Sequence, residues 1–327
     1  MTSYTKKRLT VFILLLMLVG CQYSEDATPD FSDASVIKEK FHTQRDEGDN
    51  VDSPAVWHGP DGQHWLLATA KEGDVIVVFD AKDGSLIKRI GKSGTSKGQF
   101  ERPNGIAVID NLMLVVERDN QRIQIFSLPE FNSLGSLTHE DIRLPYGLTV
   151  FSGEQRNSYE LYMTDNFNPA LEGYPPQGEL DERVHHFRFS VAGDSLQADH
   201  VGVFGDIRGE GVLHKVESLF ADPTHNRLMV ADEAFNQRNV KVYDLDGNFT
   251  GKVISSQYFS SEPEGIALYS CSDGSGYWIM TDQHESSDNK FVIFDRQSLE
   301  HVGSFKGEVT RNTDGIWLTQ KAFGSFD

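Results

Sequence analysis

The chain alternates short apolar runs with polar turns, and one arrangement of three runs recurs along most of its length. Each unit opens with a polar residue before a small residue and an apolar run, as in EGIAL at 264–268. A second run ends in two polar residues, and a third often ends in an acid, as in FVIFD at 291–295. Short runs rich in Val, Ile, Phe and Tyr between Gly and Asp turns predict β-strands.

The openings of these units recur at intervals that indicate a repeat protein. They lie 51, 42, 71, 47 and 50 residues apart, and the longest interval contains an insertion rich in Pro, Gly and acids at Asn168–Glu182. A period of about 40–50 residues with three or four short strands is typical of a β-propeller. We therefore predict an all-β, six-bladed β-propeller over residues 36–327, without a second domain. The six openings are Ser53, Asn104, Tyr146, Glu217, Glu264 and Asp314.

The sixth unit is shorter than the others. Only 13 residues follow Asp314, whereas elsewhere the second polar pair comes 14 to 20 residues after the opening. Two interpretations remain open: the last blade is incomplete, or the N-terminal segment Val36–His42 supplies a strand that closes the ring. Propellers commonly protect their sheet edges in this second way.

The first twenty residues predict a signal peptide. A basic start with Lys6, Lys7 and Arg8 precedes an apolar core, Leu9–Val19, that is too short to span a bilayer. The following LVGC resembles a bacterial lipobox, which implies cleavage before Cys21 and lipid attachment to its sulfur. Residues 21–35 are polar and acidic, which predicts a flexible tether.

The lipobox resemblance implies a protein anchored to a lipid bilayer outside the cytoplasm. Gln22 follows the cysteine, which by resemblance to sorted lipoproteins favours the outer membrane, the periplasm or the cell surface. An ordinary signal peptide with a chance cysteine is the alternative. Cys271 is the other cysteine, so a lipidated chain has no internal disulfide, and we expect a monomer.

The chain is strongly acidic, with 49 Asp and Glu against 30 Lys and Arg and a net charge of −19. Loss of the three basic residues of the signal peptide takes this charge to −22. Such a charge argues against a nucleic-acid partner. It suits a protein that works with cations, although a solvated acidic surface would give the same balance.

Equivalent positions of a propeller converge on one axis, because the first strand of each blade lines the central channel. The openings should therefore form one ring, and the second members of the polar pairs should form another close by. The first three units contribute hydrogen-bond donors, whereas the last three contribute carboxylates. The second ring comprises Lys71, Arg118, Asn166, Glu233 and Gln283.

This division of residue types predicts a phosphate site bridged by a cation. Arg and Lys recognise phosphate oxygens, and Ca²⁺ takes six to eight oxygen ligands in flexible geometry. Calcium held by carboxylates would polarise a phosphoryl group and activate a water, while Lys71 and Arg118 stabilise the charge. The alternative is a set of salt bridges across a channel that binds only water.

Other chemistry receives little support from the sequence. No Cys/His cluster favours zinc, and the strand context of His185, His186 and His301 indicates core or solvated histidines. No G-x-S-x-G motif surrounds Ser195, so this serine gives no support to a serine hydrolase.

Seven motifs in order resemble those of the β-propeller phytases, calcium-dependent phosphatases that act on myo-inositol hexakisphosphate (phytate). The resemblance extends from Ser35 to Ile316. The motifs are DNVDSPAVW at 49–57, ATAKEGDVIVVFD at 68–80, Glu117-Arg118 before IQIF, the YGL at 146–148, EGIALY at 264–269, the segment 281–294 and TDGI at 313–316.

The resemblance implies a 3-phytase-like phosphomonoester hydrolase that scavenges phosphate, with several Ca²⁺ ions and a metal-activated water at the channel mouth. It implies phosphate binding by Lys71, Arg118 and Tyr146, which with Glu217 form the catalytic set. It implies metal or metal-water ligation by Asp52, Glu217, Glu233, Glu264, Gln283 and Asp314.

The chain also departs from the family pattern, and two other functions stay open. Ser53 stands where the family has a second Asp, and Asn166 lies near the position of a phosphate-binding Lys.

The segment 98–127 fits NHL repeats equally well, which is compatible with a non-catalytic binding propeller that uses the insertion as a partner surface. A calcium-dependent propeller lactonase is the other alternative, although it has no need of the donors Lys71, Arg118 and Tyr146.

Overall fold

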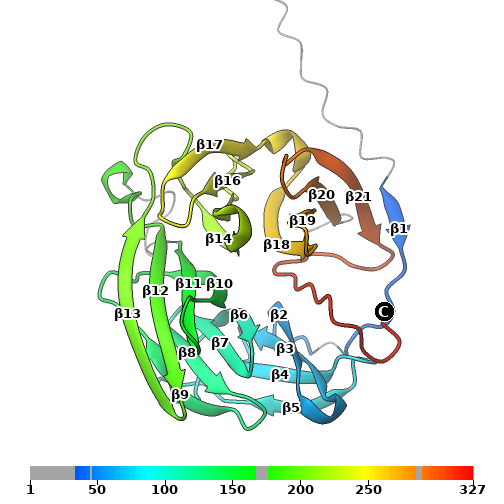
Figure 1. The fold of residues 1–327 in the computed structure, drawn as a ribbon. Helices are drawn as coiled ribbons and strands as arrows, with labels where there is room; N and C mark the ends of the chain where they lie inside the picture. The colour runs from blue at the N-terminus through cyan, green and yellow to red at the C-terminus, as the bar shows by residue number, and fades with distance from the viewer. Residues whose placement is uncertain (1–33, 45, 167–175, 285–288, 327) are drawn as a thin grey trace, which may run out of the picture.

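The computed structural model describes residues 34–44, 46–166, 176–284 and 289–326. The predicted signal peptide and Cys21 lie outside the described residues, as does the first part of the predicted insertion. Within the described ranges, no helix is long and apolar enough to cross a membrane. The described part is an all-β propeller whose sheets surround a central channel (Figure 1).

Blades 1 and 2 are antiparallel four-stranded sheets in which each strand pairs with the next along the chain. Their outer strands are shifted by a β-bulge, a feature that increases the local twist. The strands are β2 (Val51–His58), β3 (His64–Ala70), β4 (Val75–Asp80) and β5 (Leu86–Ile90), then β6 (Pro103–Ile109), β7 (Leu112–Glu117), β8 (Arg122–Ser127) and β9 (Asn132–Leu137).

Blades 3 and 4 repeat this plan. The outer strands of blade 3 are the longest, so this blade extends beyond its neighbour. The strands are β10 (Pro145–Ser152), β11 (Ser158–Asp165), β12 (Val184–Ala192) and β13 (Ser195–Phe204), then β14 (Val216–Asp222), β15 (Arg227–Asp232), β16 (Asn239–Tyr243) and β17 (Phe249–Ile254).

Blade 5 has a fifth strand that comes from the N-terminal region. Single 3-10 turns occur in the connections of the described chain. The strands are β18 (Glu262–Ser270), β19 (Gly276–Gln283), β20 (Lys290–Asp295), β21 (His301–Gly307) and β1 (Ser35–Ile37), and the turns are η2 (Pro60–Gly62), η3 (Gln177–Glu179), η4 (Pro223–His225) and η5 (Ser256–Tyr258).

The prediction of six blades is wrong, because the described chain forms five. The sixth opening, 313–316, lies in an extended segment without strand pairing between blades 5 and 1 (Figure 1). It still completes the inner ring, since Gly265 N donates to the Asp314 carbonyl at 3.1 Å. A cavity of about 60 Å³ on the axis is lined by residues of all six openings. One segment can fill an inner position, but a blade needs three further runs to pair with it.

The N-terminal strand does not close a sixth blade either. β1 pairs in parallel with β21, on the outer edge of blade 5. The Glu39 carboxylate fixes this arrangement by accepting hydrogen bonds from Val309 N at 3.0 Å and Thr310 N at 2.9 Å. The chain therefore uses its N-terminal segment to cover an exposed sheet edge.

Apolar side chains fill the seams between neighbouring blades. Trp57 of blade 1 shares a buried cluster with Met113 of blade 2, and Trp278 of blade 5 shares one with Val242 of blade 4. Trp317, from the sixth opening, packs against the first of these clusters. Full burial of one large apolar side chain contributes about 1.5–3 kcal/mol, so these seams hold the ring together.

Glycine allows the inner strands to approach one another closely. A Cβ at Gly147 would lie 2.2 Å from the Glu217 carbonyl oxygen, and one at Gly105 would lie 2.6 Å from the Tyr146 carbonyl. Any side chain there would push neighbouring blades apart. The small residue of each opening therefore sets the width of the channel.

Candidate functional site

In blades 3 and 4, an Asp at the end of the second strand fixes the loop that leads into the inner strand of the same blade. Asp165 accepts hydrogen bonds from Arg143 N at 2.6 Å and Leu144 N at 2.7 Å. Asp232 accepts from His214 N at 3.0 Å and Lys215 N at 3.1 Å. The first residue of each polar pair is thus structural in these blades, and the second residue lies at the channel.

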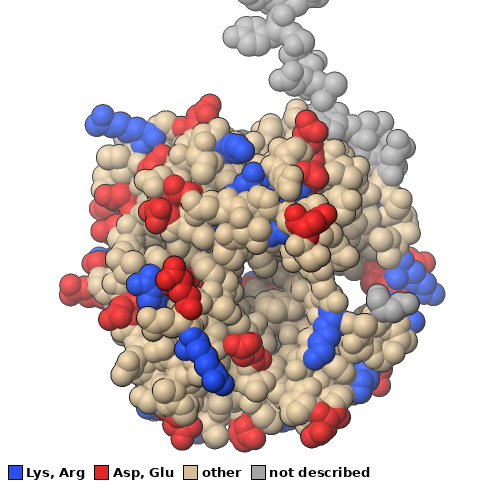
Figure 2. Space-filling model, viewed as in Figure 1, with Lys and Arg blue, Asp and Glu red and all other residues tan. Residues whose placement is uncertain are grey.

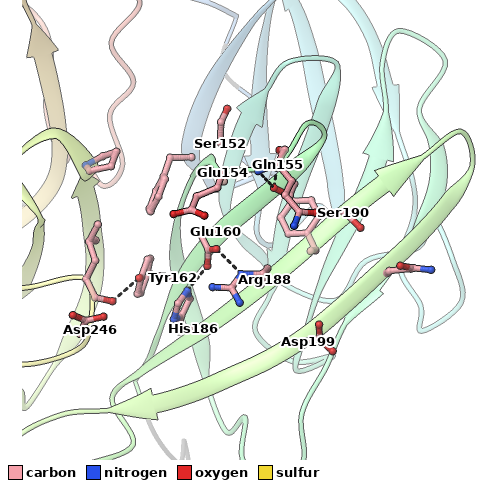
Figure 3. Close-up of a pocket in the computed structure, with 17 residues that line it drawn as sticks. Ser152, Glu154, Gln155, Glu160, Tyr162, His186, Arg188, Ser190, Asp199 and Asp246 are labelled. Carbon is pink, nitrogen blue, oxygen red and sulfur yellow. Dashed lines mark hydrogen bonds and ion pairs between the residues drawn. The ribbon is translucent and has the colours of Figure 1, made fainter.

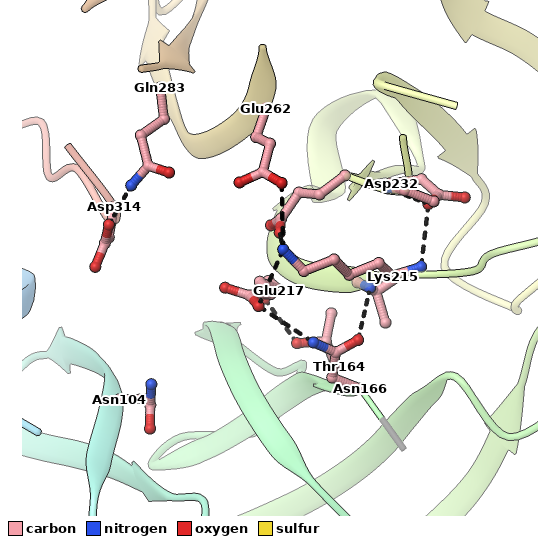
Figure 4. A network of polar contacts seen from close by, with 12 residues as sticks. Asn104, Thr164, Asn166, Lys215, Glu217, Asp232, Glu262, Gln283 and Asp314 are labelled. Atoms are coloured by element: carbon pink, nitrogen blue, oxygen red, sulfur yellow. Dashed lines mark hydrogen bonds and ion pairs between the residues drawn. The ribbon is translucent and has the colours of Figure 1, made fainter. Parts of the chain in front are cut away.

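Residues of the two predicted rings meet around the channel, whose central hollow is visible in Figure 2 and whose polar network is drawn in Figure 4. Lys71, Asp52 and Asp314 form one group. Lys71 Nζ lies 2.7 Å from Asp52 Oδ2 and 3.0 Å from Asp314 Oδ2. Burial alone would lower the pKa of Lys71, but these carboxylates raise it above its usual value. We call these three residues the paired group.

Neighbouring polar side chains support the paired group. Ser53 Oγ donates to Asp52 Oδ1 at 2.8 Å, and Gln283 Nε2 donates to Asp314 Oδ1. Burial raises the pKa of Asp314 to about 6, with the charge of Asp52 adding to the shift and Lys71 opposing it. Ser53 thus serves as a hydrogen-bond donor where the family pattern has an acid.

Glu217, Glu233 and Glu264 form a second group, the carboxylate cluster. They offer oxygens that all lie within 4.8 Å of one another. Burial raises the pKa of Glu217 to about 7, and burial and mutual repulsion raise the pKa of Glu233 and Glu264 well above the usual range. Three carboxyl groups so close together cannot all ionise without a nearby cation.

Blades 3 and 4 hold Glu217 in position. Asn166 Nδ2 donates to Glu217 Oε1 at 3.2 Å, while Asn166 Oδ1 accepts from Val216 N at 3.1 Å. Thr164 Oγ1 donates to the Glu217 carbonyl at 2.7 Å. Asn166 therefore orients a carboxylate, which is a different role from that of a phosphate-binding Lys.

Lys215 is a site residue that the sequence reasoning missed. Its Nζ lies 2.9 Å from Glu233, 3.5 Å from Glu262 and 3.8 Å from Glu217. These carboxylates raise the pKa of Lys215 against the effect of its partial burial. The available signal was its spacing, because it comes two residues before Glu217 and alternate residues of extended chain share a side.

The remaining two predicted donors differ in their surroundings. Burial raises the pKa of Tyr146, and the charges of Glu217, Asp52, Glu264 and Asp314 raise it further, so its hydroxyl stays protonated. Arg118, at the end of β7, pairs with its neighbour Asp119 at 2.7 Å. In the described ranges, Arg118 forms no ion pair with the other ring residues.

Comparison with known proteins bears on both fold and site. The sequence model of the phytase family matches residues 205–322. This segment holds the whole carboxylate cluster, Gln283 and Asp314, and it belongs to a propeller with the ring described above. This match and the propeller arrangement support a relation to the β-propeller phytase family.

Two solved structures are similar to this chain at low sequence identity. A functionally unknown protein from Desulfotomaculum acetoxidans DSM 771 matches with a TM-score of 0.51 and 12% identity, over 81% of this chain and 72% of that one. Hydrazine synthase of Kuenenia stuttgartiensis gives a TM-score of 0.45 and 12% identity, over 78% of this chain and 67% of that one. The first likeness supports the fold alone.

The donor set of the carboxylate cluster fits calcium. All of its ligand atoms are carboxylate oxygens, the type that Ca²⁺ prefers. Glu233 Oε1 is buried and, among the described residues, has no hydrogen-bond partner. An ion in the cluster would satisfy that oxygen and offset the burial and repulsion that raise the three carboxyl pKa values.

A larger cavity of about 780 Å³ lies elsewhere, between blades 3 and 4 (Figure 3). Glu160 lines it and bonds to His186 at 2.7 Å and Arg188 at 2.6 Å. None of the predicted site residues lines this cavity. The channel is the better candidate for chemistry, because it gathers the carboxylate cluster and the paired group around one axis.

The histidines considered in the sequence have protein partners. His185 is fully buried, 3.3 Å from Asp165 and 3.1 Å from His200. His186 bonds Glu160 and stacks on Tyr162, and the ring of His301 stacks on Tyr258.

Proposed function

We propose that this chain is a calcium-dependent phosphomonoester hydrolase that removes phosphate from phytate or a similar phosphorylated polyol. The observation that carries the proposal is the juxtaposition of the carboxylate cluster with the paired group around one channel. The first can hold a divalent cation, and the second contains a cation suited to phosphate. The family match indicates a phosphatase-like enzyme in agreement with this chemistry.

In this proposal, Lys71, Arg118 and Tyr146 bind the phosphate. Lys71 remains protonated because Asp52 and Asp314 raise its pKa. Tyr146 keeps its proton and donates a hydrogen bond, since a phenolate beside four carboxylates is disfavoured. Arg118 offers a planar fork of donors, and Asp119 orients it at 2.7 Å.

Glu217, Glu233 and Glu264 would hold the calcium, together with Asp52, Gln283 and Asp314 toward blade 1. When bound, calcium supplies positive charge that stabilises phosphoryl oxygens and makes a nearby water more acidic. Glu217 is suited to accept the proton of the attacking water, because Asn166 and Thr164 fix its position.

A binding propeller without catalysis is the second candidate, and one observation favours it. Lys71 already contacts two carboxylates, at 2.7 and 3.0 Å, so a phosphate must compete with them. A structural salt bridge would have the same geometry. Measured turnover is therefore needed to separate the two functions.

We also propose that the protein is lipid-anchored outside the cytoplasm through Cys21, on the basis of its N-terminal sequence. Such a location would let the enzyme scavenge phosphate from extracellular compounds. Labelling of expressing bacteria with a radioactive fatty acid should modify the wild type but not Cys21→Ala. Equal labelling of both would contradict the anchor.

The experiment that tests the activity is phosphate release from phytate by the purified full chain, first with Ca²⁺ and then with excess chelator. We expect release that needs calcium. Arg118→Ala should lower turnover about 100-fold or more without a change in thermal stability, because it removes charge stabilisation at the transition state. Arg156→Ala, at an exposed site, is the matched control. Phosphate release that is the same with calcium and with chelator, and the same in the wild type and in Arg118→Ala, would contradict the proposal.

A further inference from the structure

Lys215 already places a positive charge where the proposed function needs a metal. Its ammonium lies 2.9 Å from Glu233 and 3.8 Å from Glu217, two of the three cluster members. The Glu233 side chain is fully buried. Among the described residues, Lys215 supplies the one ammonium that forms ion pairs with this cluster.

The backbone directs this side chain toward the cluster. Lys215 N donates to Asp232 Oδ1 at 3.1 Å, and Glu233 N donates to the Lys215 carbonyl at 2.9 Å. The main chain of Lys215 is thus fixed to the end of β15, directly beside Glu233. Its side chain is 38% exposed, so the flexible stem can also carry the ammonium into solvent.

A calcium ion in the carboxylate cluster would lie close to this ammonium. The ammonium lies 2.9 Å from Glu233 Oε2, whereas Glu233 Oε1 is the buried oxygen without a partner among the described residues and is open to the ion. Two cations on the two oxygens of one carboxylate repel strongly, even with the screening near a protein surface. Calcium at Glu233 therefore favours movement of the Lys215 ammonium away from this carboxylate.

We propose that Lys215 is an intramolecular competitor for calcium at the carboxylate cluster. This inference rests on the proposed function, and it adds a means of regulation. Without metal, the ammonium offsets the repulsion among the glutamates and stabilises the fold. With metal, it swings away. The competition raises the calcium concentration at which the cluster fills, so that the enzyme is loaded only where calcium is abundant.

The test is calcium binding by calorimetry and metal-free thermal stability for the wild type, Lys215→Gln and Lys215→Arg. We expect Lys215→Gln to bind calcium about tenfold more tightly or better, since it removes the competing charge. It should also have a lower melting temperature without metal. Lys215→Arg should stay close to the wild type. Lys252→Gln, an exposed change in the same blade, should alter neither quantity.

Equal or weaker calcium binding by Lys215→Gln would overturn the proposal. If that variant does not fold without metal, lysine-selective NMR of the wild type replaces it. The Lys215 ammonium signal must then shift on addition of calcium, and an unchanged signal would overturn the proposal as well.

Phosphate release, measured in parallel, separates this inference from the proposed function. Tighter calcium binding by Lys215→Gln without any turnover would support the competition and contradict the enzyme. Turnover by Lys215→Gln with the calcium affinity of the wild type would support the enzyme and contradict the competition.

Discussion

The two charged groups around the channel solve the same electrostatic problem in different ways. In the paired group, one ammonium lies between two carboxylates, and all three side chains are at most 20% exposed. In the carboxylate cluster, three carboxyl groups within 4.8 Å share one partly exposed ammonium. With every group ionised, the first group has a net charge of −1, whereas the second has a net charge of −2.

This difference is visible in the pKa values. The charges of the paired group raise the pKa of Lys71, which keeps its cation charged. Burial raises the pKa of Glu217, Glu233 and Glu264, and repulsion from nearby carboxylates raises it further, which disfavours their charged forms. A cluster that holds protons near neutral pH is one that a divalent cation would stabilise. The family match also covers the cluster but not Lys71.

Removal of the ammonium from the paired group should have the largest effect. In Lys71→Met, Asp52 and Asp314 face each other without a counter-ion, at side chains that are 2% and 20% exposed. Loss of one partner of a buried pair costs about 3 kcal/mol or more. We expect that loss in the free energy of unfolding, and a fall in phosphatase turnover of about 100-fold or more.

Chemical denaturation and turnover of Lys71→Met are compared with those of Lys252→Met, which changes an exposed lysine. A stability equal to that of the control would mean that the Lys71 ammonium does not stabilise Asp52 and Asp314.

For the carboxylate cluster, removal of a charged group should raise the free energy of unfolding, whereas in the paired group it should lower it. Glu217 of the cluster has a folded pKa of about 7, above the ordinary 4.5, so the folded state holds the proton more tightly. The stability of the metal-free protein should therefore fall as pH rises from about 4.5 to 7. Glu217→Gln removes this term and should be more stable than the wild type by about 1–3 kcal/mol at pH 8.

Urea unfolding from pH 4.5 to 8, in the presence of chelator, measures the effect of Glu217→Gln. Glu154→Gln is the control, because Glu154 is exposed and lies outside the ring. A stability difference that stays constant with pH would show that Glu217 titrates normally.

A histidine cluster between blades 2 and 3 gives a smaller effect that sharpens the comparison. Burial and the nearby His139 and His185 lower the pKa of His200 to about 4. The unfolded state then binds more protons between pH 6.5 and 4, so stability falls as pH falls through this range. His200→Gln should reduce that acid-side loss by about 1–2 kcal/mol, after allowance for partial exposure.

Unfolding of His200→Gln at pH 4.5 and 6.5 separates this term from that of the glutamates, whose slope has the opposite sign. His42→Gln, near the N-terminus, is the control. If His200→Gln loses as much stability between pH 6.5 and 4.5 as the wild type, His200 does not contribute to the acid sensitivity of the fold.

The repeat in the sequence predicted the inner ring better than the outer sheets. Asn104, Tyr146 and Glu264 lie on inner strands, as their shared pattern of polar, small and apolar residues indicates. The number of blades was wrong because an opening identifies only an inner segment. A blade also needs the three runs that follow, and the described residues after Asp314 pair with no sheet.

A sequence repeat does not predict which side chains of different blades touch one another across the channel. Lys71 contacts Asp314, a residue 243 positions away, and this contact depends on how the last segment meets blade 1. Lys215 escaped notice because the comparison used only two positions of each unit. The roles of Asn166 and Ser53 as hydrogen-bond donors depend on rotamers, which the sequence does not determine.

Calcium calorimetry on the wild type and on Glu217→Gln/Glu233→Gln/Glu264→Gln tests the central claim most directly. The triple variant keeps the size of each side chain and removes the excess negative charge, and its melting temperature reports whether it folds. The account predicts saturable calcium binding by the wild type and loss of that binding in the triple variant. Equal binding by the two proteins would contradict the assignment of the cluster as the cation site.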